Sequence, residues 1–115
     1  MKIKYYLIGV SLFMLQLPYA QGSGLAANFE VDSVRVDRNG RGFVAFTSPL
    51  IDSPATCGSD YPNLLAFNTN TAGGRSILAV ALTAKASDKK MRVRGTGYCQ
   101  TYGVIEDWNW GRIVD

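Results

Sequence analysis

Aromatic and arginine side chains are the residues of this chain best suited to binding chemistry. Trp108, Trp110 and Arg112 alternate along one predicted strand, so their side chains are expected on one face of it. Arg92 and Arg94 alternate in the same way on the preceding strand. Flat aromatic rings can stack on sugar faces, and a guanidinium fork holds carboxylates or sulfates with two hydrogen bonds. We therefore expect these five residues to form a ligand-binding surface suited to a sialylated or otherwise acidic glycan.

A second interpretation of the same residues stays open. The tryptophans could fill the core of a small domain, while the arginines remain ordinary solvated residues. Three further aromatic residues, Tyr61, Tyr98 and Tyr102, lie near the cysteines in the sequence. The sequence alone does not decide whether the tryptophan face is core or surface.

The residue types argue against an enzyme. The chain contains no histidine, which excludes Ser-His-Asp and Cys-His nucleophilic sites. Two cysteines without histidine cannot close a tetrahedral zinc site. Glu106 and Asp107 are adjacent, so on a strand their side chains point to opposite faces and suit a glycosidase pair poorly. We expect no catalytic residues, no metal and no cofactor.

The two cysteines predict a covalent cross-link. In an exported chain, Cys57 and Cys99 are most simply one structural disulfide, which a small domain needs to supplement its core. The alternative is a redox or nucleophilic thiol, but the sequence has no C-x-x-C pair.

The N-terminus has the pattern of a secretory signal peptide over residues 1–20. Two lysines precede an apolar run of 13 residues, which is shorter than the roughly 20 residues of a membrane span. Cleavage is expected after Ala20 or after Gly22, and an uncleaved anchor is the alternative. No second apolar run follows, so no membrane association is expected after cleavage. The expected location is the bacterial periplasm or the medium.

Charge argues against a nucleic-acid partner. The whole chain has 12 Lys and Arg against 9 Asp and Glu. Two of the lysines leave with the predicted leader, so 10 basic residues face 9 acidic ones and the net charge is +1. Binding to nucleic acid normally needs a strongly basic domain or patch.

The patterning predicts one domain over residues 29–115, preceded by a flexible lead-in segment, 21–28. Strand patterns, an apolar helix and turn residues follow one another, and a long irregular connection with three prolines separates the second and third strands. A parity change near Ser33–Val34 predicts a bulge or a strand that starts late. The expected elements are strands 29–36, 42–46, 64–67, 91–96 and 107–114, a turn at 37–40, the connection 47–62 and a helix at 75–86.

The order β-β-β-α-β-β is the order of an OB-fold. We therefore expect a mainly β (α+β) domain, an OB-like five-stranded barrel with one helix between its third and fourth strands. The predicted helix is apolar over most of its circumference, which indicates packing on more than one side.

One stretch resembles a known group of proteins. The segment between the cysteines includes TAGGRSILAVALTAKASDKKMRVRGTGYC. With its apolar third strand, Ala-Lys-Ala helix end and V-x-G-x-G-x-C strand, it resembles small, uncharacterised exported bacterial proteins with an OB-like fold. The layout is also distantly similar to the B subunits of AB-type bacterial toxins, which form pentameric rings and bind host glycans. No binding residue of those subunits maps onto this chain.

These observations favour an exported, non-enzymatic binding module for a glycan or another cell-surface ligand, with homo-oligomerisation a further expectation from the resemblance. The alternative is a periplasmic structural or interaction protein that partners or inhibits another exported protein. An oligonucleotide-binding module is disfavoured by the near-neutral charge and the exported address.

Overall fold

The structure is a computed structural model that describes residues 22–115. The predicted signal peptide lies outside the described residues and stays a prediction. Within the described part, no helix is long and apolar enough to cross a membrane.

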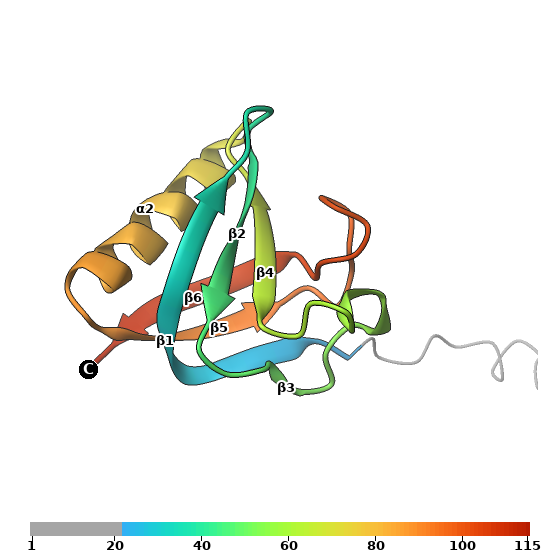
Figure 1. The fold of residues 1–115 in the computed structure, drawn as a ribbon, viewed down its shortest axis with the longest axis horizontal. Helices are drawn as coiled ribbons and strands as arrows, with labels where there is room; N and C mark the ends of the chain where they lie inside the picture. Colours follow the sequence, from blue (N-terminus) through green and yellow to red (C-terminus); the bar gives the residue numbers. More distant parts are fainter. Residues whose placement is uncertain (1–21) are drawn as a thin grey trace, which may run out of the picture.

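The described residues form a mainly β, α+β domain with a six-stranded antiparallel sheet and one helix between β4 and β5 (Figure 1). Each predicted strand and the predicted helix is present, with ends shifted by a few residues. A two-residue strand and a short 3-10 helix lie inside the connection expected to be irregular. The elements are β1 Gly24–Val36, β2 Arg41–Phe46, β3 Ile51–Asp52, η1 Thr56–Gly58, β4 Leu64–Asn68, α2 Ala72–Ala86, β5 Lys90–Gly95 and β6 Trp108–Val114.

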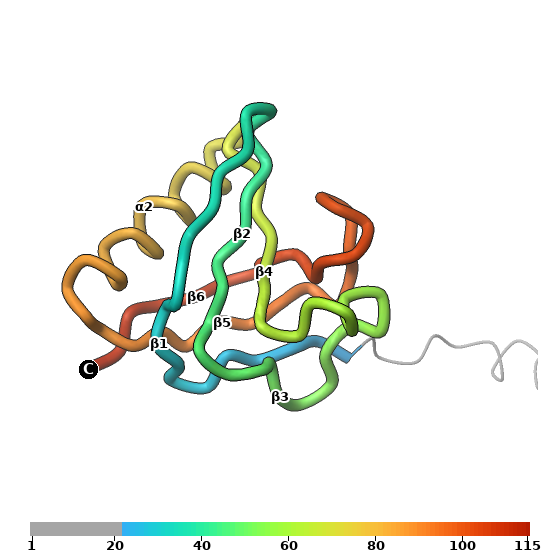
Figure 2. Tube along the Cα trace, in the orientation of Figure 1, coloured from blue at the N-terminus to red at the C-terminus, as the bar shows by residue number. Residues whose placement is uncertain are grey.

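The long strand β1 belongs to both halves of the sheet. Its first half pairs with β3 and β5, and its second half pairs with β2. The pairing register shifts between Ala27 and Phe29 and again between Val31 and Ser33, close to the predicted bulge. Bulges bend a strand and increase its twist. The trace of β1 accordingly turns from one group of strands to the other (Figure 2).

The expectation of a flexible lead-in at residues 21–28 is wrong for residues 24–28, which belong to a strand. Strand β1 begins at Gly24, and both Leu25 and Ala26 are buried. The small side chains that suggested flexibility instead permit close packing, since Ala26 lies opposite Val93 of β5 in the core.

The described residues form an open sheet, and the hydrogen bonding does not close it into the five-stranded barrel that the sequence predicts. The hydrogen-bonded order is β4-β2-β1-β5-β6, with β3 paired to β1. The two end strands approach each other at one isolated parallel bridge, between Ala66 and Asp107. There the Ala66 amide donates to the Glu106 carbonyl at 2.8 Å. Because β4 is short and β6 starts only at Trp108, the contact does not extend into a ladder.

Helix α2 starts earlier than predicted and covers one side of the sheet. The Thr71 hydroxyl accepts the Gly74 amide at 2.9 Å, which caps the helix. A side chain at Gly74 would collide with the Asn68 carbonyl, so a glycine is needed for this approach. The expectation of packing on more than one side is wrong. Ala81 and Ala84 are buried in the core against the sheet, whereas Leu82 is 49% exposed, so the opposite side of the helix faces solvent.

One hydrophobic core lies between the sheet and α2. Cys57 of η1 and Cys99 of the β5–β6 connection form the predicted disulfide, with their Cα atoms 6.2 Å apart. A disulfide of this kind is typical of an oxidising compartment. The core residues are Ala26, Val31, Val44, Phe46, Leu50, Leu65, Phe67, Ala81, Ala84, Met91, Val93 and Trp108.

Candidate functional site

Four of the five predicted binding residues lie together on the outer face of β5 and β6. In the antiparallel register, Arg92 lies opposite Arg112 and Arg94 lies opposite Trp110. Directly opposed residues of antiparallel strands project from the same face with their Cβ atoms close together. We call these four residues the arginine–tryptophan face.

The fifth predicted residue, Trp108, lies on the other side of the sheet. Neighbouring residues Arg94 and Gly95 pair with Trp110 and Trp108, so Asn109 is an extra residue and forms a bulge. Trp108 is therefore 7% exposed in the core, and Trp110 is 46% exposed. The expectation that both tryptophans share one face is wrong, because the bulge reverses the alternation between them. The signal in the sequence is Gly95, since a glycine inside a strand is typical of a bulge or a bend.

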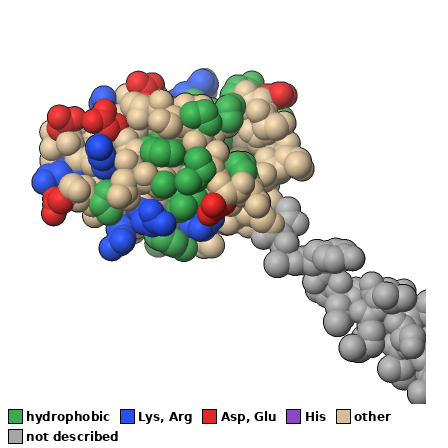
Figure 3. Space-filling view, turned by 90° about the horizontal axis from the view of Figure 1, so that it is seen from below, with side chains coloured by type: hydrophobic (Ala, Val, Ile, Leu, Met, Phe, Trp, Pro, Cys, Tyr) green, Lys and Arg blue, Asp and Glu red, His purple; other side chains and the backbone are tan. Residues whose placement is uncertain are grey.

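Apolar residues of β1 and β3 extend the arginine–tryptophan face. Leu25 lies opposite Arg94 on one side and Ile51 on the other, while Ala27 lies opposite Arg92. Leu25 is buried, and Ile51 is 46% exposed. Seen from below, this region of the molecule has hydrophobic side chains in its middle and Lys or Arg side chains along one border (Figure 3).

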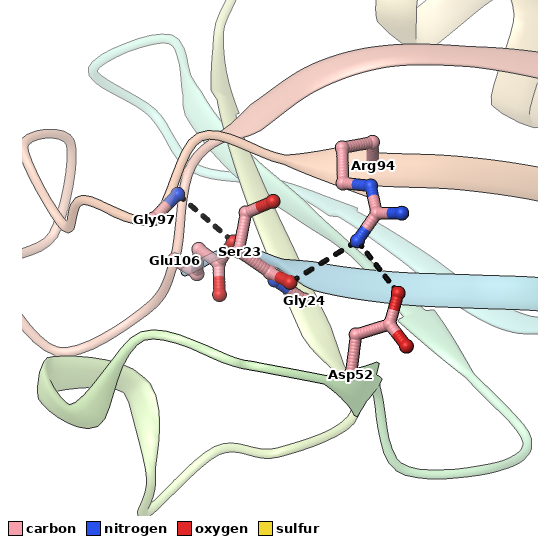
Figure 4. A network of polar contacts seen from close by, with 6 residues as sticks. All are labelled: Ser23, Gly24, Asp52, Arg94, Gly97 and Glu106. Carbon is pink, nitrogen blue, oxygen red and sulfur yellow. Dashed lines mark hydrogen bonds and ion pairs between the residues drawn. The ribbon is translucent and has the colours of Figure 1, made fainter. Parts of the chain in front are cut away.

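Arg94 is held in place by neighbouring groups. Its Nη1 atom lies 3.0 Å from Oδ2 of Asp52 and donates to the Ser23 carbonyl at 3.3 Å (Figure 4). The ion pair offsets its charge. At the other end of β5, Lys90 lies opposite Glu30 of β1.

Arg92 and Arg112 differ from Arg94 in having no counter-charge. Within residues 22–115, neither side chain makes a hydrogen bond or ion pair, although the two residues face each other across the ladder. Like charges directly opposite on neighbouring strands are destabilising. The face therefore carries two uncompensated positive charges beside an exposed tryptophan, an arrangement that an anion with a flat apolar side would stabilise.

A buried carboxylate lies beside Gly95 at the end of β5, and the sequence pattern did not reveal its role. Glu106 is 2% exposed and accepts three backbone amides, from Gly24 at 2.9 Å, Ala55 at 2.7 Å and Gly97 at 3.0 Å. A side chain at Gly95 would collide with its carboxylate. Glu106 thus joins the start of β1, the loop before η1 and the β5–β6 connection. Figure 4 shows its contact with Gly97 of that connection.

The two adjacent acids do point apart, as their positions on an extended segment predict. Asp107 accepts the amides of Gln100 at 2.7 Å and Thr101 at 3.1 Å, and so holds the β5–β6 connection from outside. The signal for the role of Glu106 is the set of glycines around its carboxylate, Gly24, Gly95 and Gly97. Only the fold shows that these glycines lie beside Glu106.

No family model, curated protein or solved structure matches this chain, so the assignment of the site depends on its own geometry.

Proposed function

We propose that this protein is an exported, non-enzymatic binding module that recognises an acidic sugar of a glycan or of another cell-surface ligand at the arginine–tryptophan face. The observation that carries the proposal is the opposed pair Arg92 and Arg112, unpaired in the described residues, beside the exposed ring of Trp110. A carboxylate placed between two guanidinium groups accepts charge-assisted hydrogen bonds from both. The apolar side of the same sugar would rest on the indole.

An OB-like arrangement of the strands is part of this proposal. The strand order and the position of α2 support it, as does the parallel contact between Ala66 and Asp107 where the two ends of the sheet approach. OB-folds are partly open barrels that commonly bind oligosaccharides or oligonucleotides. Fold likeness is an associational argument for function, so the residues of the face carry the proposal.

Export to the periplasm or the medium is the second part. The signal-peptide pattern of residues 1–20 and the Cys57–Cys99 disulfide both support it, because disulfides persist in oxidising compartments. Recognition of a glycan would take place there.

A glycan array probed with the mature domain tests the proposal. We expect retention on glycans that end in N-acetylneuraminic acid, and loss of retention for Arg112→Gln and Trp110→Ala. Arg38→Gln is the matched control, since Arg38 is an exposed turn residue that makes no hydrogen bond or ion pair among the described residues. Absence of binding to every acidic glycan, or equal loss for the Arg38 variant, would count against the proposal.

The second candidate is an interaction protein that partners or inhibits another exported protein, or that associates with copies of itself. The exposed Trp110 and Ile51 beside arginines favour it, because tryptophan and arginine are enriched at protein interfaces. Pull-down from periplasmic extract with wild type and Trp110→Ala, together with light scattering, distinguishes these cases. A monodisperse monomer that recovers only background proteins contradicts this candidate.

A further inference from the structure

A separate hollow lies away from the arginine–tryptophan face. The end of β1, strand β2, the start of β4 and the β5–β6 connection enclose about 220 Å³. No residue of the arginine–tryptophan face lines it. Its lining includes Arg35, Asp37, Phe43, Tyr61, Tyr102 and Val104.

The polar side of the hollow is a preorganised carboxylate. The Tyr102 hydroxyl donates to Oδ2 of Asp37 at 2.6 Å, and Nε of Arg35 donates to Oδ1 at 2.7 Å. The hydrogen bond from Tyr102, followed by that from Arg35, holds the pKa of Asp37 below its ordinary value. Each carboxylate oxygen keeps capacity to accept another hydrogen bond, and the terminal nitrogens of Arg35 remain donors.

The aromatic side of the hollow is also fixed by contacts with its neighbours. The Tyr102 ring meets Phe43 edge to face, with centroids 6.3 Å apart, and the Arg41 guanidinium lies 4.9 Å from the centroid of its ring. Nη1 of Arg41 also donates to the Thr101 carbonyl at 3.1 Å, which fixes the connection that carries Tyr102. At the open rim, Tyr61 and Val104 are almost half exposed.

Tyr61 also borders a second hollow of about 280 Å³. The two hollows share Tyr61 and Leu64, and the second is lined mainly by apolar groups, including Leu50 and Pro62. The exposed ring of Tyr61 therefore lies between two depressions that adjoin each other.

We propose that the hollow at Asp37 and Tyr61 is a binding site for a neutral sugar ring, distinct from the acidic-sugar site on the arginine–tryptophan face. A sugar ring has hydroxyls that donate to the Asp37 carboxylate and accept from Arg35, and an apolar side that suits Tyr61. Because Asp37 is ion-paired with Arg35, the wall carries no net charge, which suits a neutral ligand better than an anionic one. An apolar pocket with a few convergent polar groups is the usual form of a small-ligand site.

Amide NMR of the mature domain, with its backbone resonances assigned, tests the inference. The probes are methyl β-D-galactopyranoside, methyl β-D-glucopyranoside and methyl α-D-mannopyranoside, with N-acetylneuraminic acid in a separate arm. We expect at least one neutral probe to shift the amides of residues 35–37, 61–64 and 101–105. N-acetylneuraminic acid is expected to leave these amides unchanged.

Two variants make the test specific. Tyr61→Ala is expected to weaken binding of the neutral probe about tenfold through loss of ring contact. Tyr98→Ala is the matched control, because Tyr98 is 52% exposed and lines neither hollow. Since both side chains are exposed, both variants should keep the wild-type fold, which the same spectra report.

The possible outcomes separate this site from the proposed function. Shifts confined to the hollow and reduced by Tyr61→Ala but not by Tyr98→Ala support it, whatever the glycan array shows for the arginine–tryptophan face. No shift at the hollow with any neutral probe overturns it, as does stronger binding of N-acetylneuraminic acid there. An Arg112→Gln variant that loses acidic-glycan binding while the hollow still responds to the neutral probe shows that the two sites are independent.

Discussion

Arg92 and Arg112 form a pair that suits the binding of an anion but lowers the stability of the free protein. Their side chains are opposed on adjacent strands, and within residues 22–115 neither has a counter-charge. Such a pair costs stability in the free protein, and a bound anion would offset that cost.

Replacing one arginine should therefore stabilise the free domain. We expect Arg112→Gln to raise the free energy of unfolding by about 0.5 kcal/mol, because it removes a like-charge pair between strands. Urea unfolding of the two proteins at low salt measures the change, and added salt should reduce it by screening the repulsion. A less stable variant would indicate that the Arg112 side chain makes a stabilising contact.

Glu106 is the one charged residue that is buried among residues 22–115, and its hydrogen bonds make that burial possible. Its carboxylate accepts three backbone amides, and an amide side chain could not accept with its nitrogen. We expect Glu106→Gln to lower the free energy of unfolding by about 3 kcal/mol, since a donor would face a donor in the interior. Chemical denaturation checks this value.

The matched control is Glu30→Gln, the same change at an exposed acid of β1. Its effect should stay within about 0.5 kcal/mol. Equal effects of the two variants would mean that the buried hydrogen bonds of Glu106 contribute little.

Tyr102 gives a prediction in pH. Burial, followed by its hydrogen bond to Asp37, raises the pKa of Tyr102 to about 12. An unfolded chain releases the same proton near pH 10, so the folded state binds it more tightly. This contribution to stability is complete below about pH 10 and is lost as the pH rises from about 10 to about 12.

Absorbance of the phenolate band measures the ionisation of Tyr102 directly. A titration of the folded domain should contain a step near pH 12 that is missing in Tyr102→Phe, so that the two curves differ only at the alkaline end. Curves that already differ near pH 10, the ordinary value for tyrosine, would rule out the raised pKa of Tyr102.

At the scale of elements, α2 depends on a local cap that the sequence already contains. Thr71 has the residue type that favours an N-cap, and its hydroxyl accepts the Gly74 amide. We expect Thr71→Ala to cost about 1 kcal/mol in thermal or chemical unfolding. Thr83→Ala, an exposed mid-helix control, should be neutral or slightly stabilising, because alanine favours helix. Equal losses in the two variants would contradict the capping role.

The strands show where local pattern reaches its limit. The alternation of β5 and the turn at 37–40 are local features, and both are present as predicted. Strand β1 starts earlier than predicted because residues 24–26 gain their partners from β3 and β5. Small residues without a strong strand preference are extended there by their neighbours, which a local pattern does not reveal.

At the scale of the whole molecule, the disulfide fastens η1 to the β5–β6 connection across a sequence separation of 42 residues. In the chain-entropy model a loop of this length contributes about 4 kcal/mol. We expect Cys57→Ser with Cys99→Ser to lose a stability of this order in urea unfolding. The test compares the double variant with the oxidised wild type, and reductant should affect only the wild type. Equal unfolding midpoints would show that the cross-link is dispensable.

The sequence by itself determined what depends on near neighbours and on cysteine chemistry: the order of strands and helix, the hairpin turn and the disulfide. Of the five residues that it predicted to form one surface, four lie on one face. Only the tertiary structure decided that the sheet stays open and that Trp108 faces the core. Only the structure shows that the Glu106 carboxylate accepts three backbone amides, from residues 82, 51 and 9 positions away in the chain. The physical reason is that a bulge or a buried charge is stabilised by groups from remote segments, and their approach is decided only when the chain packs.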